Sequence, residues 1–187
     1  MSPLAAMKWL WSAWAISWLI AAIWSSRAQA RPKMNAEILY RVMTVAGVAA
    51  LFGSANTLRL GGEFWHTPDA VAWGLAGVTA VGFLFCWWAR IHLGTLWSSS
   101  VTRKEDHRII DTGPYARVRH PIYTGIITAS AAMASDEATP QALLGLILVV
   151  LGFWLKARLE ERFLRAELGA EAYDAYSRRT AMLFPGL

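Results

Sequence analysis

Charge is scarce in this sequence, and cysteine is almost absent. Charged residues make up 17% of the 187-residue chain, while hydrophobic residues make up 56%. A soluble domain ordinarily carries about 25% charged residues, so this composition argues against a soluble globular domain and against a disordered chain. The one cysteine, Cys86, excludes an internal disulfide framework and a zinc site built from cysteines, and we expect no metal site.

Apolar runs take the place of charge. About 20 apolar residues cross the hydrocarbon core of a bilayer, and five runs, the last two shorter, follow one another at residues 9–24, 42–58, 70–89, 122–135 and 142–155. We therefore expect an all-α integral membrane protein with five transmembrane helices, the last two forming a helical hairpin. The length fits a single domain over residues 1–187, with three spans in residues 1–90 and the remaining elements in residues 91–187.

The first run has a second interpretation. Lys8, the apolar run and the small residues Ala28-Gln29-Ala30 resemble a secretory signal peptide with its cleavage site. Against this, the run is long for such a peptide, it is rich in tryptophan, and Arg27 stands just before the site. We favour a retained membrane helix and leave cleavage of residues 1–30 open.

Lysine and arginine are distributed unevenly over the connections between these runs. Alternate connections hold 16 and 2 of the 18 positive residues. Because cytoplasmic loops are enriched in lysine and arginine, this asymmetry predicts an N-terminus outside and a C-terminus in the cytoplasm. The cytoplasmic face also accounts for the isoelectric point of about 9.7 without nucleic acid as a partner. We expect any chemistry with a soluble molecule in the two polar segments on this side, residues 92–120 and 156–187.

Residues 113–125 combine a turn with a helix start. Gly113-Pro114 marks a turn, and Pro121 suits the first position of a helix, so we expect His120 to cap the fourth membrane helix. The free N–H groups at such a helix start attract a carboxylate or a phosphate. An interfacial histidine is the simpler explanation of His120 alone, whereas the whole pattern favours a site for a zwitterionic small molecule. Two tyrosines, and a glycine that permits close approach of a helix or a ligand, flank it: Tyr115, Tyr123 and Gly125.

The fifth run continues into charged residues. Leu155, Leu159 and Phe163 recur at helical spacing and predict an apolar stripe on a continuing helix. Ionisable groups at the end of a membrane helix are costly unless they face water, a partner or a ligand, so we take Lys156 and Glu160 as functional and the later charges as a surface ladder of ion pairs. The helix is expected to end at Gly169, and the apolar and aromatic residues beyond it to fold over a bound nucleotide: Tyr173, Tyr176, Leu183 and Phe184.

The C-terminal half resembles the isoprenylcysteine carboxyl methyltransferase family and its relatives, membrane methyltransferases that include phospholipid N-methyltransferases. The likeness rests on Gly113-Pro114-Tyr115, on Arg119-His120-Pro121-Ile122-Tyr123 followed by Gly125, on Glu160-Glu161, and on Gly169 with the tyrosines after it. It implies a helical cofactor pocket on the cytoplasmic side and S-adenosylmethionine as the methyl donor. The first two runs match the family only in being hydrophobic.

Carried over by position, the resemblance implies a set of site residues. The cofactor contacts would be His107, Arg108, Ile109, Ile110, Tyr115, His120, Pro121, Ile122, Tyr123 and Glu160, and the catalytic residues Lys156, Arg158 and Glu160. The basic residue that the family sets against the acceptor falls on Lys156, where family members more often carry arginine. Because lysine does not reproduce the bidentate clamp of arginine, and Arg158 lies two residues further on, the choice between them stays open.

The implied reaction is direct methyl transfer to a lipophilic acceptor, first of all the carboxylate of an isoprenylated cysteine or a similar compound. A carboxylate is already nucleophilic and needs a cation to hold it, whereas an amine needs a base, for which Glu160 or Glu161 is available. Three alternatives stay open: a phospholipid or amine N-methyltransferase, a NADPH-dependent membrane reductase of sterol type, and a non-catalytic membrane subunit. Membrane lipids surround the protein in each case, and the oligomeric state is left open.

Overall fold

The computed structural model describes residues 1–24, 28–30, 34–53, 60–94, 97, 103–104 and 109–186, and they are mainly helical. In chain order the elements are α1 (Pro3–Ala21), η1 (Ala22–Trp24), β1 (Ala28–Ala30), α2 (Met34–Phe52), α3 (Asp69–Leu93), β2 (Arg103–Lys104), η3 (Gly113–Ala116), α4 (Pro121–Glu137), α5 (Pro140–Leu168) and α6 (Ala170–Arg179). The two short strands pair antiparallel. Apart from this pair, the prediction of an all-helical architecture is confirmed.

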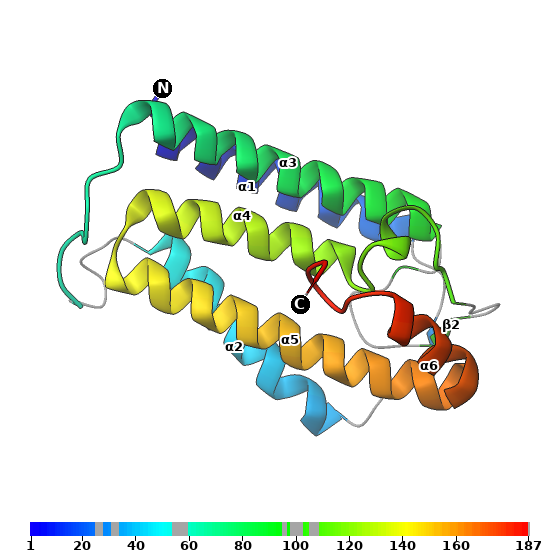
Figure 1. The fold of residues 1–187 in the computed structure, drawn as a ribbon. Helices are drawn as coiled ribbons and strands as arrows, with labels where there is room; N and C mark the ends of the chain where they lie inside the picture. The colour runs from blue at the N-terminus through cyan, green and yellow to red at the C-terminus, as the bar shows by residue number, and fades with distance from the viewer. Residues whose placement is uncertain are drawn as a thin grey trace.

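The five long helices pack in the spatial order α1, α3, α4, α5 and α2 (Figure 1). The α1–α3 pair forms one side of the bundle, the α5–α2 pair forms the other, and α4 lies between them. The end of α3, the start of α4 and the end of α5 meet at one end of the bundle, together with α6 and the C-terminal residues (Figure 1). The predicted motifs of the C-terminal half therefore lie at this end.

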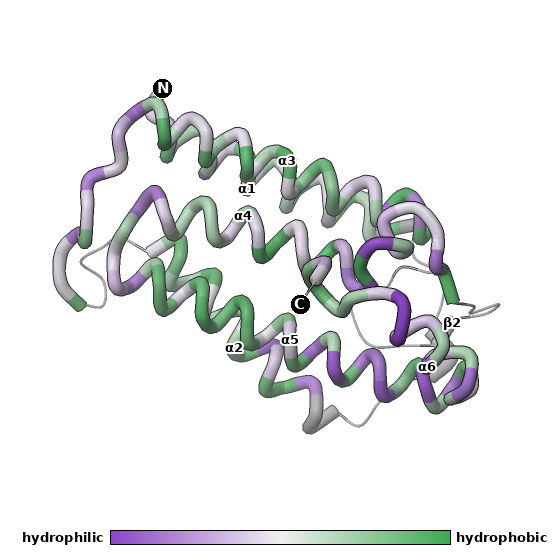
Figure 2. Tube along the Cα trace, in the orientation of Figure 1, coloured by the Kyte–Doolittle hydropathy of each residue, from purple (hydrophilic) through white to green (hydrophobic). Residues whose placement is uncertain are grey.

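Three of the described helices are long and apolar enough to cross a membrane, namely α1, α3 and α5. Helix α5 continues without a break from the fifth apolar run into the charged residues, as predicted, and it turns from hydrophobic to hydrophilic on the way (Figure 2). The second and fourth runs fall in α2 and α4, which are not among these three, and residues 54–58 of the second run lie outside the described residues. The chain is thus a membrane protein, while five transmembrane helices stay a prediction.

Glycines bring two helix pairs to backbone contact. A Cβ added to Gly145 of α5 would lie 2.8 Å from the carbonyl oxygen of Gly47 in α2, and the reverse distance is also 2.8 Å. A Cβ added to Gly82 of α3 would lie 2.8 Å from the carbonyl oxygen of Gly125 in α4. The close approach expected at Gly125 is therefore made by a helix. Small residues at such contacts set the spacing of membrane helices.

A buried arginine joins the ends of α1 and α3. Arg90 is 1% exposed, and its guanidinium donates to the carbonyls of Gly94 at 2.7 Å and Ala21 at 2.8 Å. It also lies 4.4 Å from the ring centroid of Trp97. The last carbonyls of a helix lack partners within the helix and favour a nearby cation. Arg90 therefore caps both helices at one point.

Local capping sets the limits of α4 and α5. His120 is the N-cap of α4 and Pro121 its first residue, as predicted. The Thr139 side chain caps α5 by accepting the N–H of Ala142 at 3.1 Å. Gly169 ends α5 with a φ of +96°, which confirms the predicted break. These caps fix where α4 starts relative to the charged end of α5.

We predict that Gly145→Ala destabilises the protein. The added Cβ would meet the Gly47 carbonyl oxygen and the Leu51 amide nitrogen, each 2.8 Å away, and would push α2 from α5. Overpacking of this kind costs about 1–3 kcal/mol, so the melting temperature of the detergent-solubilised protein should fall. Gly77→Ala is the matched control, because nothing lies within 4 Å of its added Cβ, and alanine favours a helix. Equal melting temperatures for the two variants would contradict the prediction.

Candidate functional site

The C-terminal residues run beside the start of α4. The Arg119 N–H donates to the Ala181 carbonyl at 2.8 Å, and the His120 N–H donates to the Met182 carbonyl at 3.1 Å. Two backbone bonds in succession fix the direction of the chain at Arg119 and His120. Both side chains then reach the carboxylates of α5.

Helix α6 covers the turn that precedes α4. Tyr173 and Tyr176 are each 5% exposed, and the Tyr176 hydroxyl donates to the Tyr115 carbonyl at 2.7 Å. Tyr115 is itself buried in η3. The aromatic residues beyond Gly169 therefore reach the predicted motif, while a nucleotide beneath them stays a prediction.

His120 lies between two consecutive carboxylates of α5. Its Nδ1 is 3.4 Å from Glu160 Oε2, and its Nε2 is 3.2 Å from Glu161 Oε1. Both ring nitrogens can donate only when the imidazole is protonated. Burial lowers the pKa of His120, but the hydrogen bonds to Glu160 and Glu161 raise it by more, so the net pKa lies above the ordinary value. The two carboxylates thus favour the protonated, cationic form of His120.

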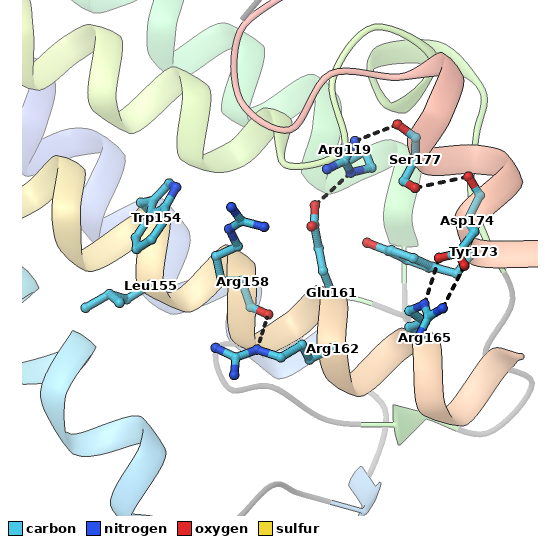
Figure 3. Close-up of a pocket in the computed structure, with 10 residues that line it drawn as sticks. All are labelled: Arg119, Trp154, Leu155, Arg158, Glu161, Arg162, Arg165, Tyr173, Asp174 and Ser177. Atoms are coloured by element: carbon cyan, nitrogen blue, oxygen red, sulfur yellow. Dashed lines mark hydrogen bonds and ion pairs between the residues drawn. The ribbon is translucent and has the colours of Figure 1, made fainter. Parts of the chain in front are cut away.

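Arg119 holds the second of these carboxylates. Its Nε donates to Glu161 Oε1 at 2.7 Å, and its Nη1 donates to the Ser177 carbonyl at 3.0 Å (Figure 3). The same Nη1 also donates to the Thr180 carbonyl. The guanidinium thereby joins the start of α4 to α5 and to the end of α6. Arg119 and Glu161 belong to two separate sequence motifs, and only the fold brings them together as a pair.

Tyr123 holds the first carboxylate. Its hydroxyl donates to Glu160 Oε2 at 2.6 Å, and its ring stacks on His120 with the centroids 5.2 Å apart. The Lys156 ammonium lies 5.1 Å from the centroid of the Tyr123 ring and is attracted by Glu160. We call His120, Tyr123, Lys156, Glu160 and Glu161 the charged cluster.

Helix α2 adds residues that the sequence analysis did not single out. The Lys156 ammonium lies 5.8 Å from the centroid of the Tyr40 ring and is also attracted by Glu37. Glu37 is 7% exposed and pairs with Arg41, while its Oε1 has no hydrogen-bond partner in the described part of the chain. The available signal was one acidic residue in the first turn of a mainly apolar helix. A buried acceptor without a donor can accept a hydrogen bond from a ligand.

The fold brings together most of the implied site residues. Those gathered at the start of α4 and the end of α5 are Tyr115, His120, Pro121, Ile122, Tyr123 and Glu160. His107 and Arg108 lie outside the described residues, and Ile109 and Ile110 are half-buried before η3. Lys156 and Arg158 point to nearly opposite sides of α5, because two residues along a helix turn it by about 200°. The exposed Arg158 side chain lies over the Trp154 ring, with its guanidinium 5.3 Å from the ring centroid.

A cavity of about 590 Å³ opens on the Arg158 side of α5 (Figure 3). Its lining comes from α5, α6 and the start of α4: Arg119, Trp154, Leu155, Arg158, Glu161, Arg162, Arg165, Tyr173, Asp174 and Ser177. Glu161 belongs to both this cavity and the charged cluster. The cavity therefore borders the cluster but opens on another face of α5.

Residues 75–166 match the sequence model of the isoprenylcysteine carboxyl methyltransferase (ICMT) family. The matched region starts within α3 and ends within α5, so it contains the whole charged cluster. A search of curated proteins found no match to the chain.

The raised pKa of His120 predicts a pH-dependent stability. A group whose pKa is raised by folding stabilises the fold fully below its unfolded pKa, about 6.5 for histidine, and this contribution is lost as the pH rises through the folded pKa. The melting temperature of the wild type should therefore exceed that of His120→Gln by more at about pH 6 than at about pH 9. Thermal unfolding in detergent at both pH values checks this, with the exposed His66→Gln as control. A difference independent of pH would contradict it.

Proposed function

Because the chain belongs to the isoprenylcysteine carboxyl methyltransferase family over residues 75–166, we propose that it transfers the methyl group of S-adenosylmethionine to the carboxylate of a lipophilic acceptor, an isoprenylated cysteine or a similar compound. Membership makes it a membrane methyltransferase, and the donor, the acceptor and the residue roles are our proposal. The observation that carries it is the charged cluster at the polar end of the apolar helix α5.

The residues at the start of α4 fit S-adenosylmethionine in their chemistry. The carboxylate of its methionine part suits the N–H groups of the first turn of α4, which no side chain caps. Its ammonium suits the carboxylate of Glu160. When bound, the cofactor supplies an electrophilic methyl group on a sulfonium. The residues proposed to hold it are Ile109, Ile110, Tyr115, His120, Pro121, Ile122, Tyr123 and Glu160, together with His107 and Arg108.

The charges of the cluster favour an anionic acceptor. With His120 protonated, His120 and Lys156 balance the carboxylates of Glu160 and Glu161, and Arg119 beside the cluster adds one further positive charge. The further carboxylate on α2 is already paired within its own helix. The excess positive charge attracts and orients an acceptor carboxylate, and Lys156 is the cation that we assign to this role. Orientation is worth much in a transfer that needs the reacting atoms in line.

An amine acceptor fits the cluster less well. Methylation of a protonated amine needs a base. Glu160 accepts from Tyr123 and His120, and Glu161 accepts from Arg119 and His120. A carboxylate that accepts two hydrogen bonds is stabilised in its charged form and is a weaker base. We therefore favour O-methylation, and the family favours methyl transfer over a nicotinamide-dependent reduction.

The surroundings of the cluster suit a lipophilic acceptor. Phe153, on the apolar part of α5, packs against Tyr123 with the ring centroids 4.9 Å apart. We propose that the acceptor approaches Lys156 from the bilayer along this apolar side, while the cofactor arrives from the cytoplasm. This arrangement requires the predicted topology, with the N-terminus outside and the cluster at the cytoplasmic side.

The detergent-purified protein is expected to bind S-adenosylmethionine with micromolar affinity. His120→Ala should bind it at least about tenfold more weakly, because the variant loses the charged hydrogen bonds by which His120 holds Glu160 and Glu161 in the site. Isothermal titration measures both affinities. Tyr123→Phe removes one hydroxyl from the same cluster and preserves the ring, which covers the case of a misfolded His120→Ala. Glu171→Ala on the exposed face of α6 is the control. No binding to the folded wild type would overturn the proposed donor, and NADPH would be titrated next.

Lys156→Met is expected to raise the KM for an acceptor carboxylate by about tenfold or more, because a charge-assisted contact is worth about 1.5–3 kcal/mol. The dissociation constant for S-adenosylmethionine should change little. Methylation of N-acetyl-S-farnesylcysteine by the detergent-purified protein measures the KM, and the exposed Arg117→Met is the control. An unchanged KM in Lys156→Met would remove Lys156 from the acceptor site.

A further inference from the structure

The cavity on the Arg158 side of α5 has a charge and a position that differ from those of the charged cluster. We propose that it binds an anionic phospholipid, with the phosphate held by Arg158 and Arg162 and the acyl chains lying along the apolar face of α5. This proposal rests on the cavity alone and does not depend on the methyl donor or acceptor.

Arg158 and Arg162 carry positive charge that the cavity does not neutralise. The two carboxylates that line it are already paired with its other two arginines, as Arg119–Glu161 and Arg165–Asp174. Within the described part of the chain, neither Arg158 nor Arg162 forms an ion pair. Arg158 and Arg162 stand one helical turn apart, and each planar guanidinium presents a fork of parallel N–H donors that suits the oxygens of a phosphate.

Arg158 stands at the depth expected of lipid headgroups, and Arg162 lies one helical turn further from the hydrocarbon core. Trp154, which is 39% exposed, lies one turn before Arg158 and contacts its guanidinium. Tryptophans of membrane proteins gather at the edge of the hydrocarbon core. At about 1.5 Å per residue, Arg158 lies about 6 Å and Arg162 about 12 Å beyond Trp154 along the helix. The headgroup layer is about 5–8 Å thick on each side of the core, so Arg158 falls within it.

The same face of α5 is apolar on the other side of Trp154. Its exposed side chains recur every three or four residues and lead to the cavity: Leu144, Ile147 and Leu151. Figure 2 shows α5 passing from hydrophobic to hydrophilic along its length. A single lipid molecule matches this apolar face with its acyl chains and the arginines with its phosphate, whereas an inorganic phosphate contacts the arginines alone.

The walls of the cavity are held in place by the protein itself. Arg165 donates to both oxygens of Asp174, at 2.7 and 2.8 Å, and so fixes α6 to α5 (Figure 3). Arg119 joins Glu161 to the Ser177 carbonyl on the adjoining side. A ligand of the cavity therefore meets a preformed site. S-adenosylmethionine carries a sulfonium and an ammonium against one carboxylate, so its net positive charge suits Arg158 and Arg162 less well than a phosphate does.

The test compares lipids on the full chain purified in a neutral detergent. The melting temperature is measured with dioleoylphosphatidylglycerol, with dioleoylphosphatidylcholine and with inorganic phosphate, and lipid retained by the protein is counted by native mass spectrometry. We expect phosphatidylglycerol to raise the melting temperature of the wild type most.

Three double variants test the arginines. In Arg158→Ala/Arg162→Ala the affinity of the protein for phosphatidylglycerol should fall by about tenfold or more. Arg117→Ala/Arg178→Ala removes the same charge from exposed positions outside the cavity and should keep the preference. Arg158→Lys/Arg162→Lys keeps the charge without the forks, so the preference should shrink but remain.

Three results would overturn the proposal. Equal effects of phosphatidylglycerol and phosphatidylcholine on the melting temperature would show that the cavity does not distinguish an anionic lipid from a zwitterionic one. Equal effects of phosphatidylglycerol and inorganic phosphate would make the cavity a site for small anions. Competition by S-adenosylmethionine would make the cavity part of the cofactor site. If the alanine variant fails to fold, the folded lysine variant decides, because undiminished binding to it would remove the arginine forks from the site.

Discussion

The contact of His120 with two consecutive carboxylates is the constraint on which the site depends. Neighbouring residues of a helix point about 100° apart, so only a group placed between two faces of α5 reaches both Glu160 and Glu161. This requires α4 to start at one particular height and the C-terminal residues to hold its backbone at Met182. Each charge is then stabilised by the others, because a polar network in a low dielectric acts as a unit.

This constraint divides α5 into two faces with different chemistry. One face carries Lys156 and Glu160 toward α4 and α2, where the rings of Tyr40 and Tyr123 enclose the ammonium. The other carries Arg158 and Glu161 toward the cavity. Glu161 contacts His120 on one side and lines the cavity on the other. A single helix that leaves the apolar layer thus serves two environments, and Glu161 connects them.

Features set by local chemistry were predictable from the sequence. Pro121 and Gly169 mark helix limits through their own backbone preferences, so the limits of α4 and α5 were expected. The contribution of Glu37 was not predictable, because Glu37 and Lys156 are more than a hundred residues apart in the sequence. They attract each other only because α2 and α5 approach closely at their glycines. The opposite directions of Lys156 and Arg158 follow from helical periodicity, but only the packed neighbours decide which direction faces the cluster.

The double cap made by Arg90 has a consequence for how the protein is made. The chain emerges with its N-terminal part first, so α1 exists before α3 has been synthesised. Until then the Ala21 carbonyl lacks the guanidinium that it accepts from in the finished fold. A buried charged side chain at the end of a membrane helix is costly until it finds partners, and Arg90 finds one of them on α1. The C-terminal ends of α1 and α3 are therefore capped together only once α3 has been synthesised, and α2 meets its main packing partner only once α5 has been synthesised.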